Sequence, residues 1–184
     1  MRVLAGEYKG KRLVTPKGTT TRPTADQVRI ALMDTLMPVL PDARMLDLFA
    51  GAGGVGFEAL SRGAAHATFV ERDPRAVQAL RQNVETLGVA ERTRVERLDA
   101  RAAVERLARE GAVFEVVFLD PPYDEDLVTP TLERLGATAV PAPGGLVIAQ
   151  HLTKKAPAER HGRLGAYRTR RFGETTLTFF RADS

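Results

Sequence analysis

Short apolar runs alternate with helical segments from residue 45 to residue 150, and this alternation constrains the fold more than any other feature of the 184-residue chain. Runs with the length and composition of strands stand at 45–49, 67–70, 93–98, 116–119 and 146–150. The segments between them carry helix signals that end at Gly63, Gly88 and Gly111, and a further helix is expected at about 126–135. A regular alternation of this kind predicts an α/β fold with a mostly parallel sheet and helices on both of its faces.

The two ends of the chain depart from this alternation. Residues 1–22 are interrupted by glycine and proline, which predicts a short hairpin and loop, and a helix is expected at about 25–37. Near the other end, 167–172 and 175–181 flank a two-residue connection typical of a β-hairpin, so we expect an antiparallel last strand. We expect one domain over 1–184, with an amino-terminal extension at 1–38 and a core at 39–184.

The composition excludes several kinds of chemistry. The chain has no cysteine, which rules out disulfides, thiolate nucleophiles and cysteine zinc sites. His66, His151 and His161 lack ligand spacing, so we expect no metal site. The amino-terminal residues contain no signal-peptide core, and no apolar run approaches a membrane span. We therefore expect a soluble cytoplasmic protein that does not bind membranes. We also expect a monomer, although no sequence feature indicates the oligomeric state.

The net charge of +4 is unevenly distributed. Residues 1–29 contain seven Lys and Arg against two acidic residues, and residues 151–184 contain eight against three, which leaves an acidic middle. Basic ends on an acidic body indicate that the ends bind a polyanion. The alternative is a solvated surface in an arginine-rich chain.

The most informative motif is Asp120-Pro121-Pro122-Tyr123, which directly follows the run at 116–119. Open α/β sheets bind ligands at the carboxyl ends of their strands. Methylation of an exocyclic amine needs acceptors for the two amine hydrogens, and the Asp120 carboxylate with the Pro121 carbonyl would supply them on a rigid frame. Tyr123 could stack on a base removed from its helix. The alternative is that the prolines only turn the chain and Tyr123 packs on the core.

A glycine pattern follows the first predicted strand. Gly51, Gly53 and Gly56 satisfy G-x-G-x-x-G, which alone would suggest NAD or FAD. Asp47 distinguishes the cofactors, since at about 4 Å and an effective dielectric of about 20 its carboxylate would repel a pyrophosphate charge by about 4 kcal/mol. The same carboxylate would help to hold the ammonium group of a methionine moiety. The pattern therefore favours S-adenosylmethionine.

Two further acids follow predicted strands. Glu71 lies 20 residues after Gly51, where an acid can bind the ribose diol of either cofactor. Asp99 could accept a hydrogen bond from an adenine amino group, directly or beside the Ala100 backbone. It could also cap the helix that begins at Ala100, and the two roles are compatible.

The chain resembles the RsmD family of 16S ribosomal RNA guanine-N2 methyltransferases over nearly its whole length. The resemblance is carried by residues 2–13, Arg22-Pro23-Thr24-Ala25-Asp26-Gln27-Val28-Arg29, residues 46–53 and Asp120-Pro121-Pro122-Tyr123. Departures from the family pattern are Gln27, where Arg is usual, and Ile30, where Glu is usual. The resemblance implies a three-layer Rossmann-like methyltransferase fold with a seven-stranded sheet, S-adenosylmethionine as donor and a guanine of 16S ribosomal RNA, naked or in the assembling small subunit, as acceptor.

The resemblance also implies which residues act. The cofactor would be held by Arg22, Thr24, Asp47, Phe49, Ala50, Gly51, Gly53, Glu71, Arg72, Asp99, Ala100 and Asp120. The guanine would be held by Asp120, Pro121, Pro122 and Tyr123, and the RNA by Lys9, Lys11 and Arg12.

Other functions stay open at this point. The same four residues at 120–123 would serve adenine N6 or cytosine N4 in DNA or RNA, although the chain has no evident target-recognition insert. A Mg²⁺ nuclease using Asp47 and Asp120 would leave the glycine pattern unexplained. A dehydrogenase-type or non-catalytic RNA-binding protein is a third class.

Overall fold

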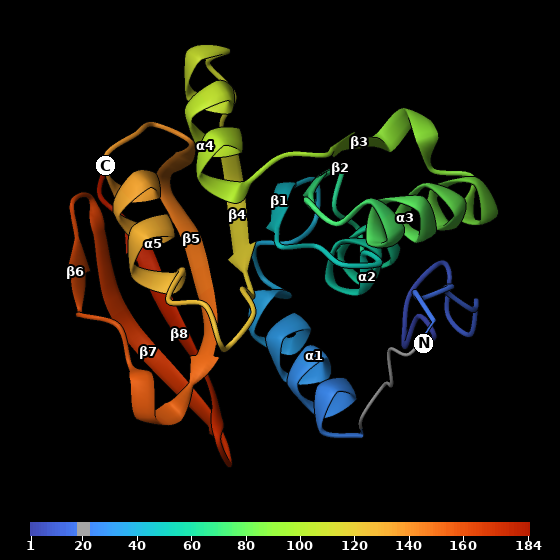
Figure 1. Cartoon of the computed structure of the whole chain (residues 1–184), viewed down its shortest axis with the longest axis horizontal. Coiled ribbons are helices and arrows are strands. Elements are labelled where there is room, and N and C mark those ends of the chain that lie inside the picture. The colour runs from blue at the N-terminus through green and yellow to red at the C-terminus, as the bar shows by residue number, and fades with distance from the viewer. Residues whose placement is uncertain (18–22) are drawn as a thin grey trace.

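A mixed sheet forms the centre of the computed structural model, which describes residues 1–17 and 23–184 (Figure 1). Its eight strands run in the order β3-β2-β1-β4-β5-β8-β7-β6. Their bounds are β1 (Arg44–Leu48), β2 (His66–Val70), β3 (Thr93–Glu96), β4 (Phe114–Leu119), β5 (Pro141–Leu152), β6 (Arg160–His161), β7 (Leu164–Phe172) and β8 (Thr175–Ala182).

The pairing of the strands confirms the expected sheet type. Strands β1 to β5 pair in parallel, whereas β8 is antiparallel to both β5 and β7. The sheet has eight strands rather than the expected seven because the two residues of β6 pair with β7 at its edge. So short a strand leaves no periodic signal in the sequence.

Helices cover both faces of the sheet and make a three-layer structure. Their bounds are α1 (Pro23–Leu36), α2 (Gly54–Ser61), α3 (Pro74–Leu87), α4 (Ala100–Arg109) and α5 (Val128–Gly136), with 3-10 turns η1 (Ala90–Arg92) and η2 (Thr153–Lys155). One core cluster joins α1, α2 and α3 to one face, and a second joins α4 and α5 to the other. Successive residues of β4 from Val116 to Leu119 alternate between the clusters, which is why a buried parallel strand reads as a continuous apolar run.

Local signals place most helix ends correctly. Asp73 caps α3 by accepting a hydrogen bond from the Arg75 amide at 2.9 Å, Pro74 occupies the first turn, and Gly88 ends the helix at φ 67°. The largest error is β5, which begins at Pro141 rather than at 146. A register shift between Phe114 and Val116 of β4 lets Pro141, at the start of β5, pair with Phe114, at the start of β4.

The amino-terminal extension is a hairpin-like loop followed by α1. Arg2 and Arg12 form an isolated antiparallel bridge, so the expected hairpin is confirmed in a reduced form. Buried Glu58 of α2 accepts the backbone amides of Leu4 and Ala5 at 2.9 and 3.0 Å. Apolar residues of the extension share a core cluster with the sheet, so the extension packs as part of the central structure. Within the described ranges, no helix has the length and apolar character that a membrane span requires.

We predict that Glu58→Ala lowers the free energy of unfolding by about 3 kcal/mol or more, because it leaves two partly buried amides and the Arg62 guanidinium, 3.0 Å away, without their buried acceptor. Denaturant unfolding measures this loss. Asp34→Ala is the matched control, since exposed Asp34 pairs with the same Arg62 at 3.6 Å and its removal should cost less than about 1 kcal/mol. Equal losses for the two variants would contradict the anchoring role of Glu58.

Candidate active site

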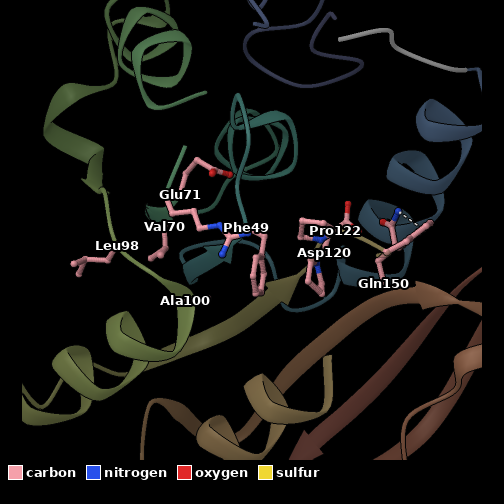
Figure 2. A pocket seen from close by; sticks show the side chains of 11 residues that line it. Phe49, Val70, Glu71, Leu98, Ala100, Asp120, Pro122 and Gln150 are labelled. Atoms are coloured by element: carbon pink, nitrogen blue, oxygen red, sulfur yellow. Dashed lines mark hydrogen bonds between the residues drawn. The ribbon is translucent and has the colours of Figure 1, made fainter. Parts of the chain in front are cut away.

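The carboxyl ends of five parallel strands surround a cavity of about 340 Å³, here called the central cavity (Figure 2). Its lining residues are Phe49, Val70, Glu71, Arg72, Leu98, Ala100, Asp120, Pro121, Pro122, Tyr123 and Gln150. Most of the residues that the sequence predicted from strand ends therefore meet in one place. A concave site with apolar walls and a few convergent polar groups is the usual form of a cofactor site.

A second cavity of about 200 Å³, here called the α1 cavity, lies beside the first. Residues from α1 and the glycine loop line it together with Met1, Asp47 and Phe118. Phe49, Asp120 and Gln150 line both cavities, so the two form adjoining parts of one site. Figure 2 shows Phe49 between the side that carries Glu71 and the side that carries Asp120.

The loop between β1 and α2 depends on unusual backbone angles. Phe49 is a non-glycine residue at φ 62°, and Gly53 has φ 93° where α2 begins. A Cβ on Gly53 would lie 2.4 Å from the Phe57 ring, and one on Gly56 would lie 2.3 Å from the Phe69 ring. The two glycines thus let the helix start directly over the strand ends.

Asp47 lies beneath this loop. It is 1% exposed, and its Oδ2 accepts the Gly56 amide at 3.1 Å. Burial raises the pKa of Asp47 to about 8, partly opposed by the Gly56 hydrogen bond and reinforced by repulsion from Asp120 and Glu71. A carboxylate in this position is stabilised by a cation in the adjoining cavity.

Two more acids face the same space. Burial raises the pKa of Asp120 to about 7. Glu71 holds the loop, because its two carboxylate oxygens accept the amides of Gly51 at 2.9 Å and Asp73 at 2.8 Å. The site therefore gathers three carboxylates at the edge of the sheet, which suits a positively charged ligand and opposes a pyrophosphate.

The residues Pro121 to Tyr123 form a wall of the central cavity. The Tyr123 hydroxyl is 3.0 Å from Thr175 Oγ1 and accepts a hydrogen bond from Gln150 Nε2 at 3.5 Å. Tyr123 is exposed (38%), and its hydroxyl is held at Thr175, the first residue of β8. The same three residues line a further cavity of about 290 Å³ on their other side, here called the η2 cavity.

Other predicted residues have definite places. Asp99 caps α4 by accepting the Arg101 amide at 2.9 Å, and its neighbours Leu98 and Ala100, rather than Asp99, line the central cavity. Arg72 lines that cavity and donates to Glu125 at 2.8 Å. Ala50 lines the α1 cavity.

The expected RNA contacts and two cofactor contacts lie elsewhere. Lys9, Lys11 and Arg12 are exposed on the amino-terminal hairpin and line neither cavity of the site. Arg22 lies outside the described residues, as does the side chain of Thr24. Ile30, where the family pattern has Glu, is exposed on α1.

The sequence reasoning missed Gln150 and Arg29. Gln150 follows the apolar run 146–149 as Asp120 follows its own, so the same signal could have found it. Arg29 of α1 is 6% exposed and lines the α1 cavity, where Nη2 donates to the Arg2 carbonyl at 2.8 Å. Its Nε is buried without a hydrogen-bond partner among the described residues. Across 1–17 and 23–184, no group of three potential ligands is placed to hold a metal ion.

A sheet of this order, with a glycine loop after its first strand and acids at neighbouring strand ends, defines the Rossmann-like S-adenosylmethionine-dependent methyltransferase fold. A solved structure of yhhF from Escherichia coli, which carries the provisional name of a methyltransferase, superposes with a TM-score of 0.87 and 33% identity, covering 100% of this chain and 98% of that one. The chain belongs to the family described as Conserved hypothetical protein 95, whose model matches residues 1–181; this is the RsmD family that the sequence resembles.

Two relatives carry names that describe an activity. A Bacillus subtilis protein provisionally named rRNA methyltransferase YlbH is 36% identical over 181 residues, 98% of both chains. The Ribosomal RNA small subunit methyltransferase D of Escherichia coli strain K12 is 41% identical over 135 residues, which cover 73% of this chain and 66% of that protein.

We predict that Asp120→Asn stabilises the protein more at about pH 8 than at about pH 5. The pKa of Asp120 rises from 3.8 to about 7 on folding, so the folded state holds its proton more tightly and the carboxyl group lowers stability as pH rises through this interval. An amide does not titrate, and the variant should lose this part of the pH dependence. Thermal unfolding of both proteins across this range measures the difference, and a constant difference would contradict the raised pKa.

Proposed function

We propose that this chain transfers a methyl group from S-adenosylmethionine to the exocyclic N2 amine of a guanine in 16S ribosomal RNA. The RNA would be met in the cytoplasm, naked or in the assembling small subunit. We propose that the chain acts as a monomer. Membership of the RsmD family and the printed names of its relatives support RNA as the substrate.

The observation that carries the proposal is the pair of acids, buried Asp47 and partly buried Asp120, beside the two adjoining cavities. Their pKa values of about 8 and about 7 mean that each carboxylate is poorly stabilised by its surroundings at neutral pH. A ligand with a sulfonium and an ammonium group supplies the positive charge that both lack. A pyrophosphate-containing cofactor would add negative charge to the same space.

The residues present fit S-adenosylmethionine along its whole length. Phe49, Val70, Leu98 and Ala100 offer apolar walls for the adenine, and Glu71 is placed for the ribose hydroxyls. Asp47 in the α1 cavity would pair with the ammonium group, and the buried Arg29 guanidinium would bind the carboxylate. When bound, S-adenosylmethionine supplies a methyl group activated on positively charged sulfur.

The acceptor would be positioned by Asp120 to Tyr123. The lone pair of a guanine N2 amine is delocalised into the ring, so acceptors for both amine hydrogens are needed to direct the lone pair toward the methyl group. The Asp120 carboxylate and the Pro121 carbonyl supply these acceptors. Stacking on the Tyr123 ring contributes about 1–3 kcal/mol. The same platform would accept adenine or cytosine amines, and the choice of guanine rests on the family.

We predict that Asp120→Ala reduces methylation of 16S ribosomal RNA by about 10²–10³-fold, because the amine loses an acceptor that matters most in the transition state. Transfer of labelled methyl groups to RNA transcribed in vitro and to assembled small subunits measures the rate. Asp124→Ala is the control, since exposed Asp124 lies in the same loop and lines none of the cavities described above. Full activity of Asp120→Ala would refute the role of Asp120, and labelling of DNA instead of RNA would refute the substrate.

We also predict that S-adenosylmethionine binding at about pH 7 releases protons, up to about one from Asp47 and about half of one from Asp120, because a nearby cation lowers a carboxyl pKa. Calorimetry in buffers of different ionisation enthalpy counts the protons. S-adenosylhomocysteine, whose sulfur is neutral, should release fewer. A binding enthalpy that is the same in every buffer would argue against the raised pKa values and the cationic ligand.

A further inference from the structure

Two further cavities extend from the wall formed by residues 120–123 toward the carboxyl-terminal hairpin. The η2 cavity begins at Pro121, Pro122 and Tyr123 and extends to Leu152 and Lys155. A cavity of about 380 Å³, here called the hairpin cavity, continues from Leu152 and is lined by Leu152, Thr153, Lys154, Arg171 and Glu174. The two share Leu152, so the surface beside the acceptor platform is hollowed as far as the β7–β8 turn.

Hydrogen bonds hold this surface in a fixed shape. The Thr153 amide donates to the Glu174 carbonyl at 2.7 Å, and Thr153 Oγ1 donates to the Gly173 carbonyl at 3.0 Å. These bonds fasten η2 to the hairpin turn. The contact between Tyr123 and Thr175 then fastens the turn to the acceptor platform. The surface is therefore positioned before any ligand arrives, which reduces the entropy that binding would cost.

The two cavities carry basic and acidic side chains in equal number. Lys154, Lys155 and Arg171 are exposed along η2 and the end of β7. The acids are Glu125, which accepts a hydrogen bond from Arg72 at 2.8 Å, Asp126, 3.2 Å from Lys155, and Glu174 of the turn. Asp126 is 87% exposed, so its ion pair contributes little and is readily exchanged for a phosphate. Among the described residues, Lys154 and Arg171 form no ion pair, so their charges are available to the phosphates of a strand that lies along the surface.

The lysines of the other basic end lie away from this surface. The amino-terminal hairpin that carries Lys9 and Lys11 is fastened to α2 and η1 through Ser61 and Arg92. Figure 1 shows this hairpin beside α2 and α3, away from β7 and β8. Lys9 and Lys11 line none of the cavities described above, whereas Lys155 lines the η2 cavity together with Pro121, Pro122 and Tyr123.

We propose that Lys154, Lys155 and Arg171, here called the hairpin surface, bind phosphates of the single-stranded RNA segment that carries the target guanine. The inference rests on the proposed function and names the place where that substrate docks. A guanine amine within a duplex is paired, so the target has to be presented from an unpaired segment. A strand lying in the η2 and hairpin cavities would place its backbone on the basic residues and bring one base to Tyr123.

The test uses a triple variant that combines Lys154→Gln, Lys155→Gln and Arg171→Gln. Its affinity for a single-stranded oligoribonucleotide that contains guanine is measured by fluorescence anisotropy at several salt concentrations. Loss of three phosphate contacts should weaken binding by about 10–100-fold near 0.1 M salt and reduce the slope of log affinity against log salt by about 2. Calorimetry should show unchanged affinity for S-adenosylmethionine, which also demonstrates that the variant is folded.

Two matched variants locate the effect. One is a triple variant, which removes the same charge from the other end of the chain through Lys9→Gln, Lys11→Gln and Arg12→Gln. The other is Arg109→Gln, which removes one exposed charge from α4. We expect both to weaken binding less than the hairpin variant does. If the hairpin variant and the wild type have equal RNA affinity and equal salt slope, the RNA-binding role of the hairpin surface is refuted. The proposed methylation of RNA is not affected by that result. Failure of the wild type to methylate any RNA would instead overturn the proposed function.

Discussion

Parallel pairing holds β1 on both sides, and the register of these two ladders decides where each functional side chain lies. Leu48 is level with Val70 on one side and with Leu119 on the other. The residues that follow, Phe49, Glu71 and Asp120, therefore emerge side by side at one edge. A shift of one residue in either ladder would send these side chains to the opposite face of the sheet. The chemistry proposed for the site thus depends first on apolar packing beneath it.

Folding brings acidic residues together at the site, although burial disfavours their charged forms. Asp47 and Asp120 are brought together with raised pKa values, and the fold tolerates them because two large core clusters surround the sheet. The amino-terminal extension completes the arrangement, since Met1 and Arg29 close the α1 cavity while Glu58 fastens the extension to α2. Parts of the chain that are distant in sequence thereby line one cavity.

Sequence reasoning recovers the features that depend on strand ends and local signals. The glycine loop, Glu71, Asp120 and the cap at Asp73 all follow from residue type and position, because the carboxyl ends of parallel strands share one edge. Arg29 could not be found in this way, since its burial depends on how α1 packs over the loop. The charge pattern predicts two basic ends but not which of their residues adjoin the acceptor platform. Tertiary structure places Arg29 in a cavity with Asp120, and Lys155 in a cavity with Tyr123.

The backbone at Phe49 has a consequence for how this protein could be altered. A left-handed conformation costs a residue with a Cβ roughly 1–2 kcal/mol, whereas glycine adopts it freely. Glycine would therefore relax the loop, but it would also remove the ring that stands between the two adjoining cavities. No single substitution to glycine can both relax the backbone at this position and keep the ring between the two cavities. Engineering for thermal stability should accordingly begin elsewhere in the chain.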